Sequence, residues 1–178
     1  MSNEITETLT GGLEPQQLRR QLQEKQTKTL RRRRAIIGLS LLGMGAMTAV
    51  SLFQTGVIGH LPDPPIDSFD SDKVNSSDTA YALGVPDGTL SLASLAANIP
   101  IAAFGGENRA QEQPIVPVLA AGKALVEAVV AGWYFYQMPV VEKKWCGYCI
   151  TGALCNMGIA ALSLPEAVEA LEALKDRQ

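Results

Sequence analysis

Cysteine and histidine are scarce in this chain of 178 residues, which contains three cysteines and one histidine. A structural zinc site needs four ligands. Beside Cys146 and Cys149, the sequence offers only Cys155 and His60, and no second Cys-x-x-Cys motif is present. These counts argue against a zinc site.

Charged residues are missing from long stretches of the chain. The longest of these is Ala35–Ile58, which carries no charge. A helix over this stretch, at 1.5 Å per residue, would be longer than the roughly 30 Å thickness of a bilayer core, so the stretch predicts a membrane span. The polar residues 1–34 in front of it and the lack of an A-x-A cleavage site favour a signal anchor over a cleaved signal peptide.

Three further stretches have few or no charges, namely Gly88–Gly106, Pro114–Val141 and Trp145–Leu164. The first of them is weakly hydrophobic and contains Asn98 and Pro100, which suits a helix packed against other helices. We therefore predict an all-α protein, an integral membrane four-helix bundle over residues 35–165, with a loop at 59–87 between the first two spans.

The charge distribution predicts the orientation of this bundle. The net charge is −3, but basic residues cluster before the first span and end in Arg31–Arg34. Basic flanks tend to stay in the cytoplasm, so the tail 1–34 and a C-terminal helix at 166–178 are expected there. The tail is expected to contact anionic membrane lipid rather than nucleic acid, because its basic run directly abuts a span. The acidic loop 59–87 is then extracytoplasmic.

This orientation places Cys146 and Cys149 at the outer mouth of the bundle, in a compartment that permits disulfides. Cys-x-x-Cys at a helix start is typical of a redox dithiol, because unpaired N–H groups there stabilise a thiolate. Cys146 is expected to be the exposed thiol, with Cys149 one turn deeper. The alternative is a pair of small buried hydrophobic residues without a redox role.

Two other groups of charged residues have alternative interpretations. Lys123 and Glu127 lie four residues apart, on one face of a predicted helix. They could form a proton route, a contact with a partner subunit, or a structural ion pair in which the two charges neutralise each other. In the loop, Asp67, Asp70 and Asp72 suggest a lid over the bundle mouth or a calcium site, although their spacing is not that of an EF-hand.

The order of these parts resembles the vitamin K epoxide reductase family over about Arg34 to Ala167. The segment "LGVPDGTLSLASL" is similar to the entry of that family's second span, and "WCGYCITGALCN" is similar to its redox site. The loop "FQTGVIGHLPDPPIDSFDSDKVNSSDTAY" resembles a small bacterial branch of stand-alone members.

This resemblance implies a membrane thiol–disulfide oxidoreductase, an enzyme in which Cys149 passes electrons to a quinone and Cys146 forms the mixed disulfide with a second dithiol. Asp87 stands where the family often places an Asn that hydrogen-bonds a quinone carbonyl. Asp87, Cys149 and Tyr148 are therefore the candidate quinone-binding residues. The expected quinone is ubiquinone, menaquinone or plastoquinone, and the expected partner is an external thioredoxin-like dithiol protein. The expected location is the bacterial inner membrane, with both termini in the cytoplasm.

The chain departs from the family in one respect. Members usually carry two further cysteines in the first outer loop, which shuttle electrons to the Cys-x-x-Cys pair, but no cysteine occurs between Gly59 and Gly88. Either an external dithiol reaches Cys146 directly, or the chain is a non-catalytic assembly or interaction subunit that retains the fold and a quinone pocket.

Overall fold

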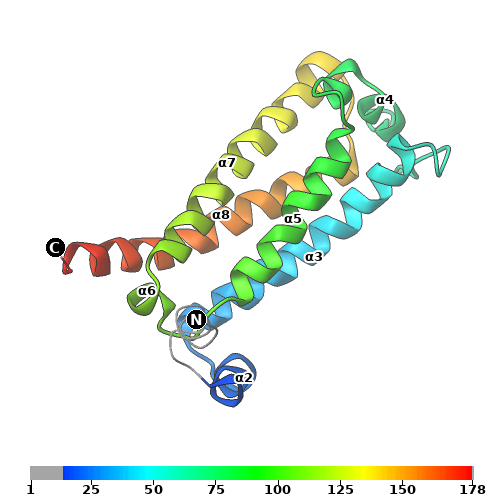
Figure 1. Cartoon of the computed structure of the whole chain (residues 1–178). Helices are drawn as coiled ribbons and strands as arrows, with labels where there is room; N and C mark the ends of the chain where they lie inside the picture. The colour runs from blue at the N-terminus through cyan, green and yellow to red at the C-terminus, as the bar shows by residue number, and fades with distance from the viewer. Residues whose placement is uncertain (1–13, 178) are drawn as a thin grey trace.

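The computed structural model describes residues 14–177, and these residues are mostly helical, with no β-strand among them. Four long helices lie side by side (Figure 1): α3 Lys28–Gln54, α5 Asp87–Ala103, α7 Ile115–Gln137 and α8 Gly147–Lys175. The shorter helical elements are α2 Pro15–Glu24, α4 Ser71–Asn75, η1 Asp78–Tyr81, α6 Arg109–Glu112 and the π-turn η2 Met138–Glu142. The all-α prediction is confirmed for the described residues.

Three of the long helices are long and apolar enough to cross a bilayer: α3, α7 with the turn that follows it, and α8. Their outward faces carry large apolar side chains, including Leu42, Leu119 and Val129, as expected of a surface that faces lipid. The remaining long helix, α5, has 17 residues and is not among these candidate spans. The structure therefore supports three spans, and the predicted four-span bundle stays a prediction.

Small residues let the long helices approach one another closely. A Cβ atom added to Gly43 of α3 would lie 2.9 Å from Leu95 of α5 and 3.3 Å from Cys155 of α8. Close backbone contact through small residues is the usual way in which membrane helices associate, because burying apolar surface gains little in lipid. The buried Cys155 is thus a packing residue between α3 and α8.

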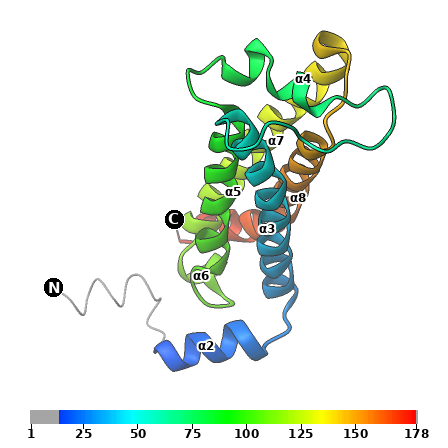
Figure 2. The ribbon, with the colours of Figure 1, turned by 90° about the vertical axis from the view of Figure 1, so that its right-hand side faces the viewer.

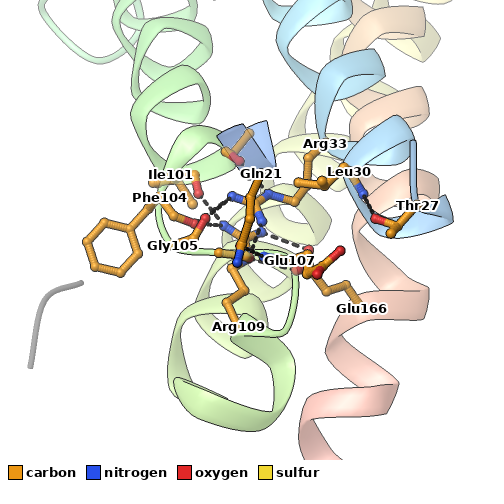
Figure 3. A network of polar contacts seen from close by, with 12 residues as sticks. Gln21, Thr27, Leu30, Arg33, Ile101, Phe104, Gly105, Glu107, Arg109 and Glu166 are labelled. Carbon is orange, nitrogen blue, oxygen red and sulfur yellow. Dashed lines mark hydrogen bonds and ion pairs between the residues drawn. The ribbon is translucent and has the colours of Figure 1, made fainter. Parts of the chain in front are cut away.

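Buried arginines hold together the end of the helices where α3 begins and α5 ends, which we call the arginine end (Figure 3). Arg33 donates to the carbonyl oxygens of Ala102, Phe104, Gly105 and Gly106 at 2.6–3.0 Å. Ala102 lies in the last turn of α5, and the other three residues directly follow the helix, so Arg33 acts as a C-terminal cap from another helix. The basic cluster expected to set orientation therefore also supplies a structural residue.

The opposite end, which we call the cysteine end, is covered by the segment between α3 and α5 (Figure 2). Phe69 and Trp145 form an isolated parallel bridge, in which Asp70 N donates to Trp145 O at 3.0 Å and Trp145 N donates to Ser68 O at 2.8 Å. This pairing fastens the segment to the residues directly before α8. Helix α2 lies crosswise to α3 near the arginine end, and none of its residues is buried (Figure 2).

Candidate functional site

The Cys-x-x-Cys pair begins helix α8. Cys146 is the N-cap residue, and its Sγ accepts the backbone N–H of Cys149 at 3.2 Å. The first N–H groups of a helix have no partner within the helix, so a sulfur at the N-cap satisfies one of them and gains stabilisation as a thiolate. All three cysteines are free, so the structure represents the dithiol state.

Helix α4 supplies further hydrogen bonds to this pair. Asn75 Nδ2 donates to Cys146 Sγ at 3.2 Å, and Asn75 Oδ1 accepts from the Cys149 thiol at 3.5 Å. The hydrogen bond from the Cys149 thiol, followed by those from the Ser71 side chain, the Cys149 N–H and Asn75, lowers the pKa of Cys146 to about 7, although burial opposes the shift. Cys146 is thus the more acidic thiol of the pair, and a substantial fraction of it is thiolate near neutral pH.

The prediction that Cys146 is the exposed thiol is wrong. Cys146 is 0% exposed, because α4 covers it with the buried side chains of Ser71 and Asn75. Cys149 lies one turn further along α8, as expected, and is the half-buried cysteine of the pair. The error arose because the position of each sulfur depends on how residues 59–87 fold over the helix start, which helix periodicity does not describe.

A cavity of about 460 Å³ lies beside Cys149, between the long helices and under the segment that covers the cysteine end. This volume is within the range of small-molecule sites. Its lining extends along α8 from Cys149 to Asn156 and along α5 from Asp87 to Ser94. Seven residues of helix rise about 10 Å in each case. The cavity walls are largely apolar, and polar side chains line the cavity both at its mouth and about 10 Å deeper.

Asp87 lies at the mouth of the cavity, at the first residue of α5 and outside the three candidate spans. Its Oδ1 accepts from Gln54 Nε2 at 2.7 Å, and Gln54 Oε1 accepts from Gly88 N at 3.0 Å. Burial raises the pKa of the Asp87 carboxyl, against the lowering effect of the Gln54 hydrogen bond. The structure therefore brings Asp87 and Cys149 to one cavity, and the protonated form that could donate to a ligand is favoured by burial.

Tyr148 does not join them. Its hydroxyl donates to Pro62 O at 3.0 Å, and it is absent from the residues that line the cavity. Tyr148 instead helps to fasten the covering segment to α8, because consecutive residues of a helix point about 100° apart.

Three residues of the site had no role in the sequence interpretation, namely Gln54, Ser71 and Asn75. Each is nearly or fully buried and polar, and each makes side-chain hydrogen bonds around the cysteine pair or Asp87. Their role depends on contacts between residues far apart in the sequence. Of the three, only Gln54 gave a signal in the sequence, as a polar residue inside the uncharged stretch Ala35–Ile58.

Lys123 and Glu127 form an ion pair, as their spacing predicted. Lys123 Nζ also donates to Ser94 O at 2.9 Å and to Asn98 Oδ1 at 2.8 Å. Glu127 accepts from the Ser94 hydroxyl and, at 3.2 Å, from Asn98. The pair therefore joins α7 to α5, and Glu127 and Ser94 line the cavity.

The acidic residues of the covering segment hold its backbone. Asp63 accepts from the backbone and side chain of Ser71 at 2.6 Å, and Asp70 caps α4 through Lys73 N at 2.9 Å. Asp72 accepts from Leu61 N at 2.8 Å and pairs with His60. Within residues 14–177, no three His, Cys, Asp or Glu side chains come together as metal ligands would. The segment lies over the helix ends as the lid interpretation expected.

A quinone ring fits this site by the chemistry of its lining: apolar walls, a thiol and a carboxyl at the mouth, and polar groups about 10 Å deeper. Comparison with curated protein sequences gives no match. Comparison with protein families matches residues 34–164 to the vitamin K epoxide reductase family. The match covers the second candidate span, most of the other two, the covering segment and the cysteine pair. It agrees with the all-helical fold of an integral membrane protein. The chain belongs to the vitamin K epoxide reductase family.

Proposed function

We propose that this protein is a quinone-linked thiol–disulfide oxidoreductase that works through Cys146 and Cys149. The observation that carries the proposal is the position of the pair: Cys146 is the low-pKa thiolate, and Cys149 forms part of the cavity wall. Family membership supports oxidoreductase activity in general. The assignment of the two cysteines rests on their geometry.

The chemistry of the pair balances as a two-electron exchange. When Cys146 and Cys149 form one S–S bond, they release two electrons and two protons, which is what a quinone needs to become a quinol. Cys149 faces the cavity and is the residue from which electrons leave. Cys146 then accepts attack by an external thiolate, and the exchange returns the pair to the dithiol state while the partner becomes oxidised.

The burial of Cys146 sets a condition on this exchange. An external thioredoxin-like dithiol protein can reach the sulfur only after α4 moves away from it. Asp63 and the Phe69–Trp145 bridge hold α4 in place through a few partly buried hydrogen bonds, which open more readily than packed helices. We therefore propose that the partner displaces the covering segment when it docks.

We further propose that α5 completes a four-helix bundle in the bacterial inner membrane, with both termini cytoplasmic. Its 17 residues and its contacts with α3 and α7 suit a helix enclosed by others more than one facing lipid alone. The basic residues near the start of α3 support the orientation. The quinone is ubiquinone, menaquinone or plastoquinone.

A second function, a non-catalytic assembly or interaction subunit, is favoured by one observation. The covering segment contains no cysteine, and Cys146 has no route to solvent in the described structure. Such a protein would retain the cavity and its ligand without thiol exchange.

The deciding experiment uses the purified full-length protein in detergent, reduced and then mixed with ubiquinone or menaquinone. Alkylation followed by mass spectrometry measures the free thiols. We expect quinone-dependent formation of a Cys146–Cys149 disulfide, absent in Cys149→Ala and retained in Cys155→Ala, which alters only a packing cysteine. If both thiols stay free under excess quinone, the oxidoreductase proposal is wrong and the subunit function is favoured.

A further inference from the structure

One face of helix α8 forms a wall of the cavity, and its side chains change in character along the helix. Cys149, Gly152, Ala153 and Asn156 all line the cavity. The last three lie three, four and seven residues beyond Cys149, the spacing that puts residues on one helix face. Seven residues rise about 10 Å. This face therefore carries a sulfur at the mouth, two small residues in the middle and a carboxamide at the inner end.

The carboxamide of Asn156 has an accessible donor that the protein does not use. Its oxygen, Oδ1, is buried and has no hydrogen-bond partner within residues 14–177. Its nitrogen, Nδ2, also lacks a partner in this part of the chain, but unlike Oδ1 it is not buried. Nδ2 is therefore the polar atom that Asn156 presents to the cavity. An amide NH₂ group donates two hydrogen bonds, so an acceptor on a bound molecule can pair with it.

The other polar side chains at the inner end offer a ligand no free donor in the described structure. Ser94 of α5 lines the cavity, but its hydroxyl donates to Glu127. Glu127 of α7 is an acceptor, which also takes hydrogen bonds from Lys123 and Asn98. The ammonium group of Lys123 balances the charge of this carboxylate. Asn156 is thus the residue that can donate to a ligand at this depth.

Two O–H groups stand at the opposite end of the cavity, near its mouth. Asp87 Oδ1 accepts from Gln54 Nε2 at 2.7 Å, so a proton on this carboxyl lies on Oδ2. Tyr134 of α7 also lines the cavity, and its hydroxyl is close enough to Asp87 for their charges to interact. Within residues 14–177 this hydroxyl makes no hydrogen bond. The mouth therefore offers a ligand the phenol of Tyr134 and, in its protonated form, the carboxyl of Asp87.

The separation of these two ends matches the length of one class of ligand. The carbonyl oxygens of a para-quinone are about 5 Å apart, and a hydrogen bond of about 3 Å at each end gives a span of about 11 Å between donors. The mouth and the inner end of the cavity are separated by about 10 Å of helix rise. Between them, the small side chains of Gly152 and Ala153 leave room for a flat ring beside α8.

We infer that Asn156 Nδ2 binds the inner carbonyl of a para-quinone, whose outer carbonyl accepts from Asp87 or Tyr134 at the mouth. This inference rests on the proposed function and names the residue that orients its ligand. With both carbonyls held, the ring lies lengthwise along α8 and keeps one edge beside Cys149, from which the electrons leave. An ortho-quinone has neighbouring carbonyls and can pair with the donors of one end only.

The test measures binding to a protein that cannot turn over. In full-length Cys149→Ala, purified in detergent, equilibrium dialysis compares duroquinone with durene, the same tetramethyl ring without its two oxygens. Asn156→Leu, which keeps a similar side-chain volume but removes the donor, should weaken duroquinone binding about fivefold to tenfold and leave the Kd of durene unchanged. Met157→Leu, at an exposed position outside the cavity lining, should change neither Kd.

Unequal effects on the two ligands separate a lost hydrogen bond from damage to the fold. If Asn156→Leu weakens both ligands equally, or weakens neither, the inference is wrong. A second measurement needs no change at Asn156. Duroquinone should bind Cys149→Ala about tenfold more tightly than tetramethyl-ortho-benzoquinone, its isomer with neighbouring carbonyls. Equal Kd values for the two isomers would overturn the inference even if Asn156→Leu does not fold.

The proposed function fails separately from this inference. Selective loss of duroquinone binding in Asn156→Leu, with no quinone-dependent disulfide in the native protein, would retain the carbonyl site and reject the oxidoreductase. A quinone-dependent disulfide, together with duroquinone binding that Asn156→Leu leaves unchanged, would retain the oxidoreductase and reject the carbonyl site.

Discussion

The carboxamide of Asn75 contacts both sulfurs of the Cys-x-x-Cys pair, donating to Cys146 at 3.2 Å and accepting from Cys149 at 3.5 Å. Its Nδ2 is also held by Ser71 O at 2.8 Å, one turn earlier in α4. A neutral amide that donates to one sulfur and accepts from the other distinguishes two otherwise similar thiols. The hydrogen bond from Nδ2 is one of those that lower the pKa of Cys146.

Replacing Asn75 should therefore change the ionisation of Cys146. In Asn75→Leu, the donor to Cys146 Sγ is lost, so the pKa of Cys146 should rise above its native value of about 7. At pH 7 the thiolate fraction falls, so alkylation of Cys146 during transient openings of the covering segment slows by several fold. Peptide mass spectrometry over pH 5–10 gives the midpoint. Ser76→Ala, an exposed neighbour, should keep the native midpoint, and an unshifted midpoint in Asn75→Leu would exclude this role.

Ser71 lies against Cys146 and offers a test of the covering segment. Its hydroxyl donates to Asp63, its side chain is one of the groups that lower the pKa of Cys146, and both Ser71 and Cys146 are 0% exposed. Ser71→Cys should therefore form a disulfide with Cys146 on mild oxidation, detected as a linked peptide under non-reducing conditions. Ser76→Cys, exposed just after the same helix, should form none. Absence of the link from Ser71→Cys would mean that α4 does not sit on Cys146.

The Lys123–Glu127 pair should stabilise the fold only while both members are present. Lys123→Met leaves the Glu127 carboxylate without its counter-ion in an apolar region, which costs on the order of 2–3 kcal/mol. Lys123→Met with Glu127→Leu removes both charges and should recover most of the loss. Unfolding in detergent titrated with SDS measures each free energy. Additive losses in the double variant would show that the two side chains act independently.

The buried pair at the arginine end should be more costly to break. Arg109 donates to Glu166 through two nitrogens at 2.7 and 2.8 Å, and the two side chains are 2% and 5% exposed (Figure 3). Glu166→Leu leaves a buried guanidinium without its partner, so we expect a loss of about 3–5 kcal/mol in the same unfolding assay. Glu169→Leu, exposed one turn later, serves as the control and should change stability little. Equal effects of the two substitutions would contradict the assigned burial.

The sequence alone determined the helical class, the first, third and fourth hydrophobic helices and the cysteine pair at a helix start. These features follow from local composition, because uncharged runs of sufficient length predict helices that cross a bilayer. The cysteine pair stands at the beginning of the last such run, Trp145–Leu164, and therefore at the start of a helix. The pairing of Lys123 with Glu127 was also predictable, because residues four apart share one helix face. Asp87 directly precedes the uncharged stretch Gly88–Gly106 in the sequence, and it is the first residue of α5.

Only the tertiary structure decided which sulfur is covered, which residues reach the cavity and where its polar groups face. Asn75 and Cys146 are 71 residues apart, and Gln54 and Asp87 are 33 apart. No periodicity within one helix records such contacts. Tyr148 turns toward Pro62 and Asn156 borders the cavity because the packing of α8 against its neighbours sets its rotation. The helices are determined by local sequence, whereas the site is formed by the packing of these helices against one another.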